Sequence, residues 1–248
     1  MGQDIAKGDA KYLDDEETFI ETYDKRTSFT NTDLSNMIRK IHNKLNLTIR
    51  MIIGRGWGQG PTHSQSYHSF LASIPGLNVY YPTNPLNAYL TIKKGLQSRG
   101  PTIMIEHRWL HNSSQLIENF DQELDILDSL KIYKKGSDIT LLTYGYMLPE
   151  ALKADKLINE IGIKSEIISL ERLTDISWFP LYESIKKTRN LLIIEPYYLE
   201  GSIWTGLISE IIRKLSSDSS FLNGFDIVSL PFENESTSYF QTKKRYIN

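Results

Sequence analysis

A histidine in a glycine-rich loop is the first candidate for chemistry in this sequence. The stretch GRGWGQGPTHSQS, residues 54–66, places His63 among four glycines. The unperturbed pKa of histidine lies near neutrality, so a histidine held at a cleft can act as a general acid or base. The alternative is a surface or capping histidine just before a helix. The loop has neither the G-x-G-x-x-G spacing nor the lysine of a P-loop, so it gives little support to nucleotide binding.

Five other side chains are weighed as site residues. Glu106 and Glu195 each close an apolar segment, where a carboxylate serves either a site or an ion pair that holds loops together. His107 and His111 have a spacing that suits a metal on a helix, but their surroundings do not indicate a helix. We therefore predict no metal site. His68 falls in the helix expected after the loop, and we expect it to be packed or at an interface.

Alternating strands and helices are expected to position these residues. In the first half of the chain we expect helices at 33–45, 64–74 and 85–98 and strands at 47–54, 77–82 and 102–107. Such alternation indicates parallel β-α-β units, in which sites collect at the carboxyl ends of strands. Only three convincing strands are present in this half, so the first domain is predicted to be incomplete.

The same alternation of strands and helices returns in the second half, after a polar, acidic stretch. There we expect strands at 139–145, 164–173, 190–196 and 225–231 and helices at 148–162, 178–188 and 202–215. We predict an α/β fold with a partial first domain at 1–115, a linker at 116–136 and a complete second domain at 137–248.

Composition narrows the classes of function. The formal net charge of -2 does not favour a polyanionic partner, so we expect no nucleic acid. No cysteine is present, which excludes disulfides, thiol nucleophiles and cysteine-bound metals. The first residues are acidic and lack the apolar core of a signal peptide, and no apolar run is long enough to cross a bilayer. We expect a soluble, cytoplasmic protein with no membrane partner.

Two stretches of the sequence resemble one known family. The segment from GQGPTHSQS to TIMIEHRWLH, residues 58–111, resembles the pyrimidine-binding domain of β subunits of thiamine-diphosphate-dependent 2-oxo acid dehydrogenase E1 components, within the transketolase superfamily. GSDITLLTYGYMLPEALKA and LLIIEPYYLEG resemble the C-terminal domain of the same subunits. The resemblance implies an abbreviated three-layer pyrimidine-binding domain followed by a transketolase C-terminal-type α/β domain.

The resemblance also implies a function. Relatives decarboxylate a 2-oxo acid or transfer a two-carbon unit with thiamine diphosphate and Mg2+. The histidine that matches His63 faces the reactive side of the cofactor, so His63 is the predicted catalytic residue. The G-D-G and asparagine motif of the diphosphate domain is absent from this chain. The resemblance therefore implies an α-type partner subunit that holds most of the cofactor, together with self-association.

The activating glutamate of the family has no convincing counterpart in this sequence. By spacing it would fall at or before Met1, and Glu16, Glu17 and Glu21 lie too close to the helix expected at 33–45. Three alternatives therefore stay open. The chain is a non-catalytic or regulatory remnant that keeps the oligomer interface, one half of a split enzyme, or a shortened sequence.

Overall fold

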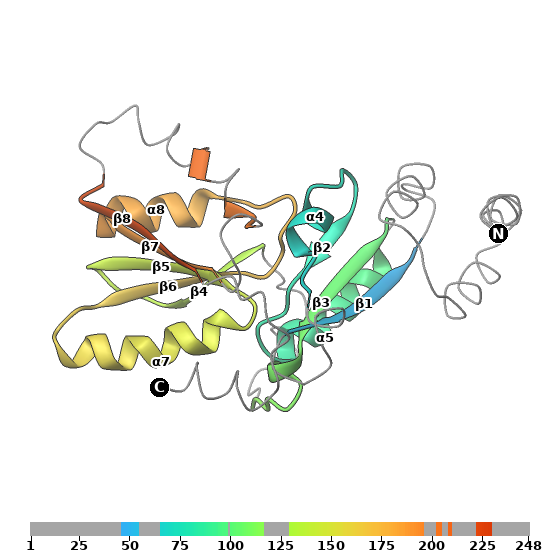
Figure 1. The fold of residues 1–248 in the computed structure, drawn as a ribbon, viewed down its shortest axis with the longest axis horizontal. Helices are drawn as coiled ribbons and strands as arrows, with labels where there is room; N and C mark the ends of the chain where they lie inside the picture. The colour runs from blue at the N-terminus through green and yellow to red at the C-terminus, as the bar shows by residue number, and fades with distance from the viewer. Residues whose placement is uncertain are drawn as a thin grey trace, which may run out of the picture.

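Two α/β units make up the described part of the chain. The computed structural model describes residues 46–54, 65–98, 100–116, 129–195, 202–204, 208–209 and 222–229. The first unit has a three-stranded sheet and the second a five-stranded sheet, and the two lie side by side (Figure 1). The loop at 55–64, the helix expected at 33–45 and most of the helix expected at 202–215 lie outside the described residues.

The first unit is a small parallel sheet flanked by helices. Its elements are β1 (Thr48–Ile53), α4 (His68–Ala72), β2 (Asn78–Tyr80), α5 (Pro85–Gln97), β3 (Thr102–His107) and the 3-10 helix η2 (Arg108–Leu110). The strand order is β1-β3-β2, and both pairings are parallel. The central strand β3 is buried along its whole length. An apolar run covered on both sides is what a parallel sheet requires.

The start of α5 follows from local chemistry. Asn84 is the N-cap, and its side chain accepts a hydrogen bond from the backbone N–H of Asn87 at 3.0 Å. Pro85 occupies the first turn, where its missing N–H costs nothing. Leu86 and Leu90 then carry the buried face of the helix. The helix expected at 85–98 is therefore found almost residue for residue.

The second unit is a larger sheet with one antiparallel edge strand. Its elements are β4 (Leu130–Lys134), β5 (Ile139–Tyr144), α7 (Met147–Glu160), β6 (Ser165–Leu170), α8 (Phe179–Thr188), β7 (Asn190–Glu195) and β8 (Gly224–Ser229). The strand order is β4-β6-β5-β7-β8, with β4 antiparallel to β6 and the other pairs parallel.

Neighbouring residues of β5 and β6 face opposite layers. Leu141 and Ile167 belong to a buried cluster with residues of α7. Leu142 and Ile168 lie instead in the main core with Leu181 of α8. Because side chains alternate along a strand, α7 and α8 cover opposite faces of the sheet, as Figure 1 shows. This is the three-layer arrangement of an α/β domain.

One hydrophobic core runs through both units. Ile49, Val79 and Ile103 from the first sheet belong to the same buried cluster as Leu142 and Ile168 from the second. Burial of apolar surface stabilises by roughly 25 cal/mol per Å², so a shared core resists separation of the units. The two units are therefore packed as one body of structure rather than joined only by the chain.

Two boundaries differ from the sequence expectation. The strand β4 lies inside the range 116–136 that was assigned to a linker, so the second sheet starts earlier than predicted. The strand was missed because Lys131 and Lys134 interrupt its apolar residues, a pattern permitted at a sheet edge. The helix expected at 64–74 spans only His68–Ala72, because residues 65–67 are not helical and a turn follows at 73–76. The outer domain limits stay predictions.

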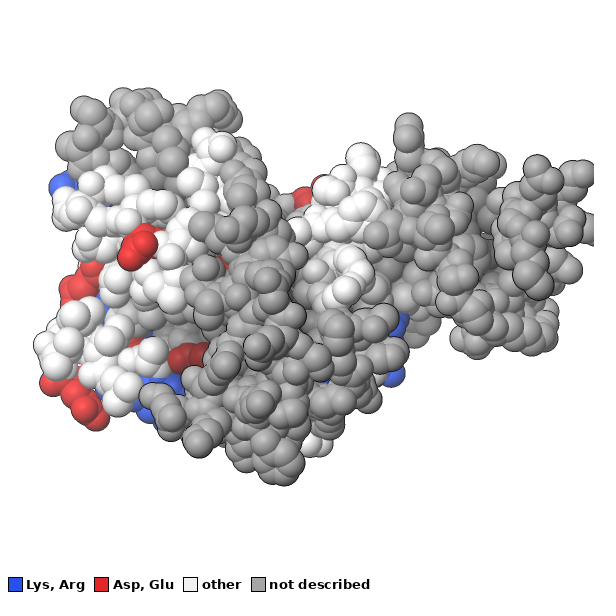
Figure 2. Space-filling model, viewed as in Figure 1, with Lys and Arg blue, Asp and Glu red and all other residues white. Residues whose placement is uncertain are grey.

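Charge is spread rather than concentrated on the visible face of the second unit. Figure 2 shows acidic and basic side chains interspersed over its surface. Lys153 pairs with Glu150 on α7, and Lys186 pairs with Glu183 on α8, each three residues apart. Exposed pairs of this kind contribute little to stability. Among the residues that the structure describes, no helix combines the length and apolar character needed to cross a bilayer.

A segment of the second unit extends the sheet of the first. The backbone N–H of Tyr81 donates to the carbonyl of Glu171 at 3.0 Å, and the N–H of Leu173 donates to the carbonyl of Val79 at 2.7 Å. Residues 171–174 therefore pair with the free edge of β2. We call this pairing the joint.

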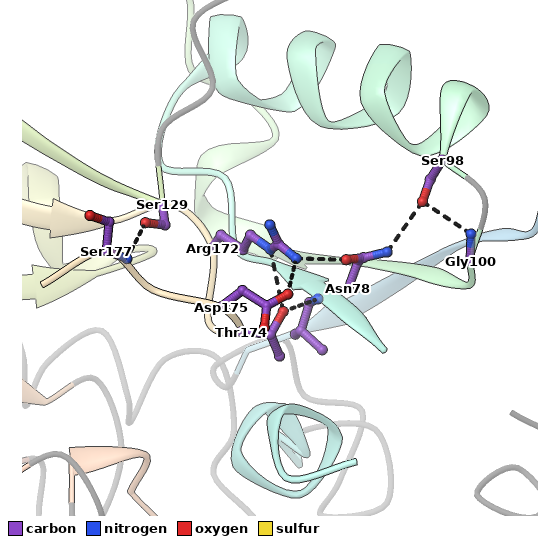
Figure 3. A network of polar contacts seen from close by, with 9 residues as sticks. Asn78, Ser98, Gly100, Ser129, Arg172, Thr174, Asp175 and Ser177 are labelled. Atoms are coloured by element: carbon purple, nitrogen blue, oxygen red, sulfur yellow. Dashed lines mark hydrogen bonds and ion pairs between the residues drawn. The ribbon is translucent and has the colours of Figure 1, made fainter. Parts of the chain in front are cut away.

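Side chains reinforce the joint. Arg172 donates to Asn78 Oδ1 at 2.7 Å and to Asp175 Oδ2 at 2.6 Å (Figure 3). The N–H of Val79 donates to Thr174 Oγ1 at 3.1 Å. The bond from Thr174 satisfies the N–H of Val79, a fully buried residue, and the bonds of Arg172 hold the rim of the joint. The relative register of the two units is thereby fixed.

A glycine at the end of β5 presses against the first unit. Gly145 has a φ of +56°, and a Cβ added there would lie 2.4 Å from ring atoms of Tyr81. Tyr81 is fully buried, so its ring has no room to move away. Glycine is required at this position both by the backbone conformation and by the close approach.

Gly145→Ala is expected to destabilise the protein by about 3 kcal/mol, since left-handed strain and overpacking against Tyr81 add. The measurement is urea unfolding of the full chain. Gly162→Ala is the matched control, because Gly162 has a φ of +86° but no atom within 4 Å of an added Cβ. The control is expected to lose only about 1 kcal/mol. Equal losses in the two variants would contradict a packing role for Gly145.

Candidate functional site

Strand ends from both sheets meet between the two units. Gly54 follows β1 and His107 ends β3, while Tyr144 ends β5 and Glu195 ends β7. In open α/β sheets, the crevice beyond the carboxyl ends of the strands is where ligands bind. We call this region the strand-end junction, and it is the candidate site.

A buried chain of hydrogen bonds crosses the strand-end junction. The Tyr144 hydroxyl donates to Glu195 Oε1 at 2.6 Å and lies 2.7 Å from His68 Nε2. The other ring nitrogen of His68, Nδ1, lies 2.7 Å from Ser66 Oγ. The Ser202 hydroxyl donates to Glu195 Oε2. These hydrogen bonds thus link Ser66, after the undescribed part of the glycine-rich loop, to the ends of β5 and β7.

The hydrogen bonds define the tautomer of His68. Because the Tyr144 hydroxyl donates to Glu195, its oxygen accepts a hydrogen bond from His68 Nε2–H. Nδ1 is then the acceptor for the Ser66 hydroxyl. Burial lowers the pKa of His68 to about 3, so the ring is neutral at physiological pH. His68 is packed in the core at the interface between the units, as the sequence predicted.

An aromatic cluster forms the other side of the strand-end junction. The ring of His107 stacks on Tyr146, with centroids 4.6 Å apart and planes 15° from parallel. Trp109 meets both rings edge to face. Gly54 has a φ of +115°, and a Cβ there would lie 2.9 Å from His107 Nε2. The loop therefore leaves β1 in contact with His107, which only glycine allows at that distance.

Glu106 belongs to an ion-paired group beside the junction. Arg50 Nε and Nη2 lie 2.5 and 2.9 Å from the two oxygens of Glu106, and His111 Nε2 lies 3.2 Å from Oε2. The hydrogen bond and the charge of Glu106 raise the pKa of Arg50. A cleft of about 610 Å³ opens here, lined by this group and by residues of α5 such as Tyr89. Of the two roles considered for Glu106, the structure supports the ion pair.

His107 and His111 have separate partners, the aromatic cluster and Glu106 respectively. In the described ranges, no group of three or more histidine, cysteine, aspartate or glutamate side chains is arranged to hold a metal ion. The i, i+4 spacing of the two histidines corresponds to a strand end followed by a 3-10 turn, not to one face of an α-helix.

Comparison with known families decides the identity of these units. Residues 19–112 match the transketolase pyrimidine binding domain, and residues 128–245 match the transketolase C-terminal domain. The chain belongs to the transketolase superfamily. The resemblance and the fold class predicted from the sequence are confirmed. The first unit is accordingly the pyrimidine-binding unit, and the second is the C-terminal unit.

Relatives in the superfamily are β subunits of pyruvate dehydrogenase E1. The chain is 34% identical over 174 residues to the pyruvate dehydrogenase E1 component subunit beta of Staurastrum punctulatum, covering 68% of this chain and 53% of the relative. It is 32% identical over 180 residues to the same subunit of Chlorokybus atmophyticus, covering 73% and 52%. The chain spans about half the length of these curated relatives.

A solved structure supports the fold. The chain matches a protein described as a split gene transketolase, an inactive β4 tetramer, with a TM-score of 0.61 and 19% identity. The match covers 85% of this chain and 67% of that one. At this level of identity the likeness concerns the fold alone.

The predicted catalytic residue, His63, lies outside the described residues, so its role stays a prediction. The residues on either side of its loop are described. Gly54 lies so close to His107 that an added Cβ would be 2.9 Å from Nε2, and Ser66 is hydrogen-bonded to His68. Both ends of the loop are therefore anchored at the strand-end junction.

Tyr144, Tyr146, Trp109 and Ser202 of the strand-end junction were not singled out from the sequence. A signal for three of them was available, because Tyr144 ends an apolar strand and Tyr146 and Trp109 each follow the end of one by two residues. The signal for Ser202 was not, because its contact with Glu195 depends on how the chain turns back.

Tyr144→Phe is expected to destabilise the protein by about 1–3 kcal/mol, because the buried groups of His68 and Glu195 lose their shared partner. Chemical denaturation of the full chain measures the loss. Tyr89→Phe is the control, since Tyr89 is 46% exposed and water can replace its contacts. If Tyr144→Phe lost no more stability than the control, the buried hydrogen bonds of Tyr144 would not stabilise the folded protein.

His68 is expected to remain neutral, with the proton on Nε2, between pH 5 and pH 8. Because its folded pKa of about 3 lies below the ordinary value of 6.5, its contribution to stability is present above pH 6.5 and is lost as the pH falls towards 3. Nitrogen-15 NMR of the imidazole measures the protonation state. An imidazolium pattern near pH 6 would show that the ring is charged and that the assigned tautomer is wrong.

Proposed function

We propose that this chain is a β-type subunit of a thiamine-diphosphate-dependent enzyme. It would act with an α-type subunit on a 2-oxo acid, by oxidative decarboxylation, or transfer a two-carbon unit. The observation that carries the proposal is the anchoring of the glycine-rich loop at both ends in the strand-end junction. Relatives named as pyruvate dehydrogenase E1 β subunits support the choice of reaction class.

The described residues suit one part of the cofactor better than the other. The aromatic cluster offers ring faces and edges at the junction, and Trp109 and Tyr146 are only partly buried. Among the described residues, no three histidine, aspartate or glutamate side chains are grouped as a metal site. In line with the resemblance, the proposal assigns the metal and the diphosphate to the partner chain, and the pyrimidine ring to this one. When bound, thiamine diphosphate supplies the carbanion chemistry of the reaction.

The residues of this chain would orient the substrate and exchange protons with it. His63 is the proposed general acid or base, because the described residues on both sides of its loop lie at the strand-end junction and the ordinary pKa of a histidine is near neutrality. His68 would hold the segment after the loop through Ser66 without carrying charge. The solved neighbour is described as a β4 tetramer, and we propose that this chain also associates with itself.

Thiamine diphosphate with Mg2+ is expected to bind saturably only when the chain is co-expressed with an α-type partner. Isothermal calorimetry on the chain alone and on the co-purified pair measures this. In the pair, His63→Ala is expected to lower turnover by about 10²- to 10⁴-fold, the usual size of general acid-base catalysis. His42→Ala is the control histidine, and both variants must retain the wild-type unfolding profile.

The outcomes separate the remaining interpretations. Absence of binding with every α-type candidate would contradict the proposal and favour a non-catalytic subunit that keeps the oligomer interface. Binding with normal turnover in His63→Ala would contradict the role of His63 alone. Loss of turnover in both histidine variants would point to general disruption and would also remove support for a specific role of His63.

A further inference from the structure

A second buried carboxyl group lies between the units, in the segment that forms the joint. Glu171 is 1% exposed. The Tyr133 hydroxyl of β4 lies 2.7 Å from Glu171 Oε1, and the Thr83 hydroxyl lies 3.1 Å from each oxygen. Thr83 belongs to the pyrimidine-binding unit, whereas Tyr133 and Glu171 belong to the C-terminal unit. The carboxyl group therefore bonds across the interface.

An amide oxygen competes with Glu171 for the same two protons. Asn87 Oδ1 lies 2.9 Å from both the Thr83 and the Tyr133 hydroxyl oxygens. Each hydroxyl has one proton to donate, and Asn84 Nδ2 already donates to the Tyr133 oxygen at 2.9 Å. A proton on Glu171 removes the competition, because the carboxyl then donates to one hydroxyl oxygen and leaves a hydroxyl proton for Asn87.

The groups that face Glu171 give its charge little compensation. The start of α5 presents only neutral side chains, Thr83, Asn84 and Asn87, and β6 adds the hydroxyl of Ser169. Lys131 on β4 acts at a distance, and its ammonium lies 5.6 Å from the centre of the Tyr133 ring.

The neighbouring arginine, Arg172, does not bond to the carboxyl group of Glu171. Arg172 is directed to Asn78 and Asp175 instead. Within the described ranges, no cationic side chain is hydrogen-bonded to Glu171.

Burial is the largest influence on the pKa of both acidic groups in this network, Glu171 and Tyr133. Burial raises the pKa of Glu171 to about 7, although hydrogen bonds from Tyr133 and Thr83 and the charge of Lys131 act in the opposite direction. Burial and the nearby carboxyl group also raise the pKa of Tyr133. A negative charge is therefore disfavoured at either position.

A second buried glutamate of the same unit shows the contrast. Burial alone would raise the pKa of Glu166, but hydrogen bonds from Lys187 and Ser184 hold it below its ordinary value. Both side chains are nearly inaccessible to water, at 2% for Glu166 and 1% for Glu171. Glu166 lies nearer the surface, bonded to the half-exposed Lys187, whereas Glu171 lies deeper and has no bonded cation within the described ranges. Depth and the cation together separate the two glutamates.

We propose that Glu171 carries a proton in the folded protein below neutral pH, and that its ionisation weakens the joint between the pyrimidine-binding and C-terminal units. The folded pKa is raised from an ordinary 4.5 to about 7. The stabilising contribution is therefore complete below pH 4.5 and is lost as the pH rises through about 7. The joint becomes tighter in mildly acidic solution than in mildly alkaline solution.

Urea unfolding of the full chain at pH 5 and pH 8 tests the protonation. Between these values the folding equilibrium constant of the wild type is expected to fall about 100-fold more than that of Glu171→Gln, since each unit of pKa difference is tenfold. Glu166→Gln is the matched control and is expected to keep this wild-type fall. An identical pH dependence in the wild type and Glu171→Gln would overturn the proposal.

Hydrogen exchange tests the location of the effect. The amides of Tyr81 and Leu173 bond across the joint. Their protection is expected to drop about tenfold or more from pH 6 to pH 8 in the wild type, after correction for intrinsic exchange, but not in Glu171→Gln. Equal protection at both pH values in the wild type would show that ionisation does not reach the joint, and would overturn that part of the proposal.

A measurement on the wild type keeps the proposal testable if Glu171→Gln does not fold. Carbon-13 labelling of glutamate carboxyl groups is expected to show one group that titrates near pH 7. Tyr133→Phe removes a donor to the ionised carboxyl, so it is expected to move this titration to higher pH. A spectrum in which every glutamate of the folded wild type is ionised at pH 6 would overturn the proposal.

Discussion

The pairing of residues 171–174 with the edge of β2 is the constraint on which the arrangement of the two units depends. An edge strand leaves backbone N–H and C=O groups that cost free energy if they are buried without partners. The bonds made by Tyr81 and Leu173 satisfy these groups and fix the register of one unit against the other. Once that register is set, the ends of β5 and β7 face the ends of β1 and β3.

The turn after β5 brings residues of the C-terminal unit into contact with the strand-end junction. Tyr144 reaches His68, and Tyr146 reaches His107, while Gly145 lies against Tyr81 between them. Ser66 and Gly54 at the two ends of the glycine-rich loop contact those same two histidines. The C-terminal unit therefore supports a loop that belongs to the pyrimidine-binding unit.

Buried carboxyl groups in this structure differ in what neutralises them. Glu106 has a guanidinium, Glu166 an ammonium, and Glu195 two hydroxyl donors. Glu171 has hydroxyl donors that it shares with an amide oxygen. Since the cost of a buried charge depends on these partners, the same side chain is a stable ion pair at one position and a protonated acid at another. Burial alone does not specify either state.

The sequence by itself determined the superfamily and most of the strands and helices, because apolar periodicity and ordered motifs such as GPTHSQS are carried by residues close together in the chain. It did not reveal β4, whose lysines at a sheet edge look like a linker. Only the tertiary structure decided the partner of His68, since Tyr144 lies 76 residues away in the chain. It also decided the state of Glu171, because burial and the lack of a bonded cation within the described ranges arise only when two distant segments pack together.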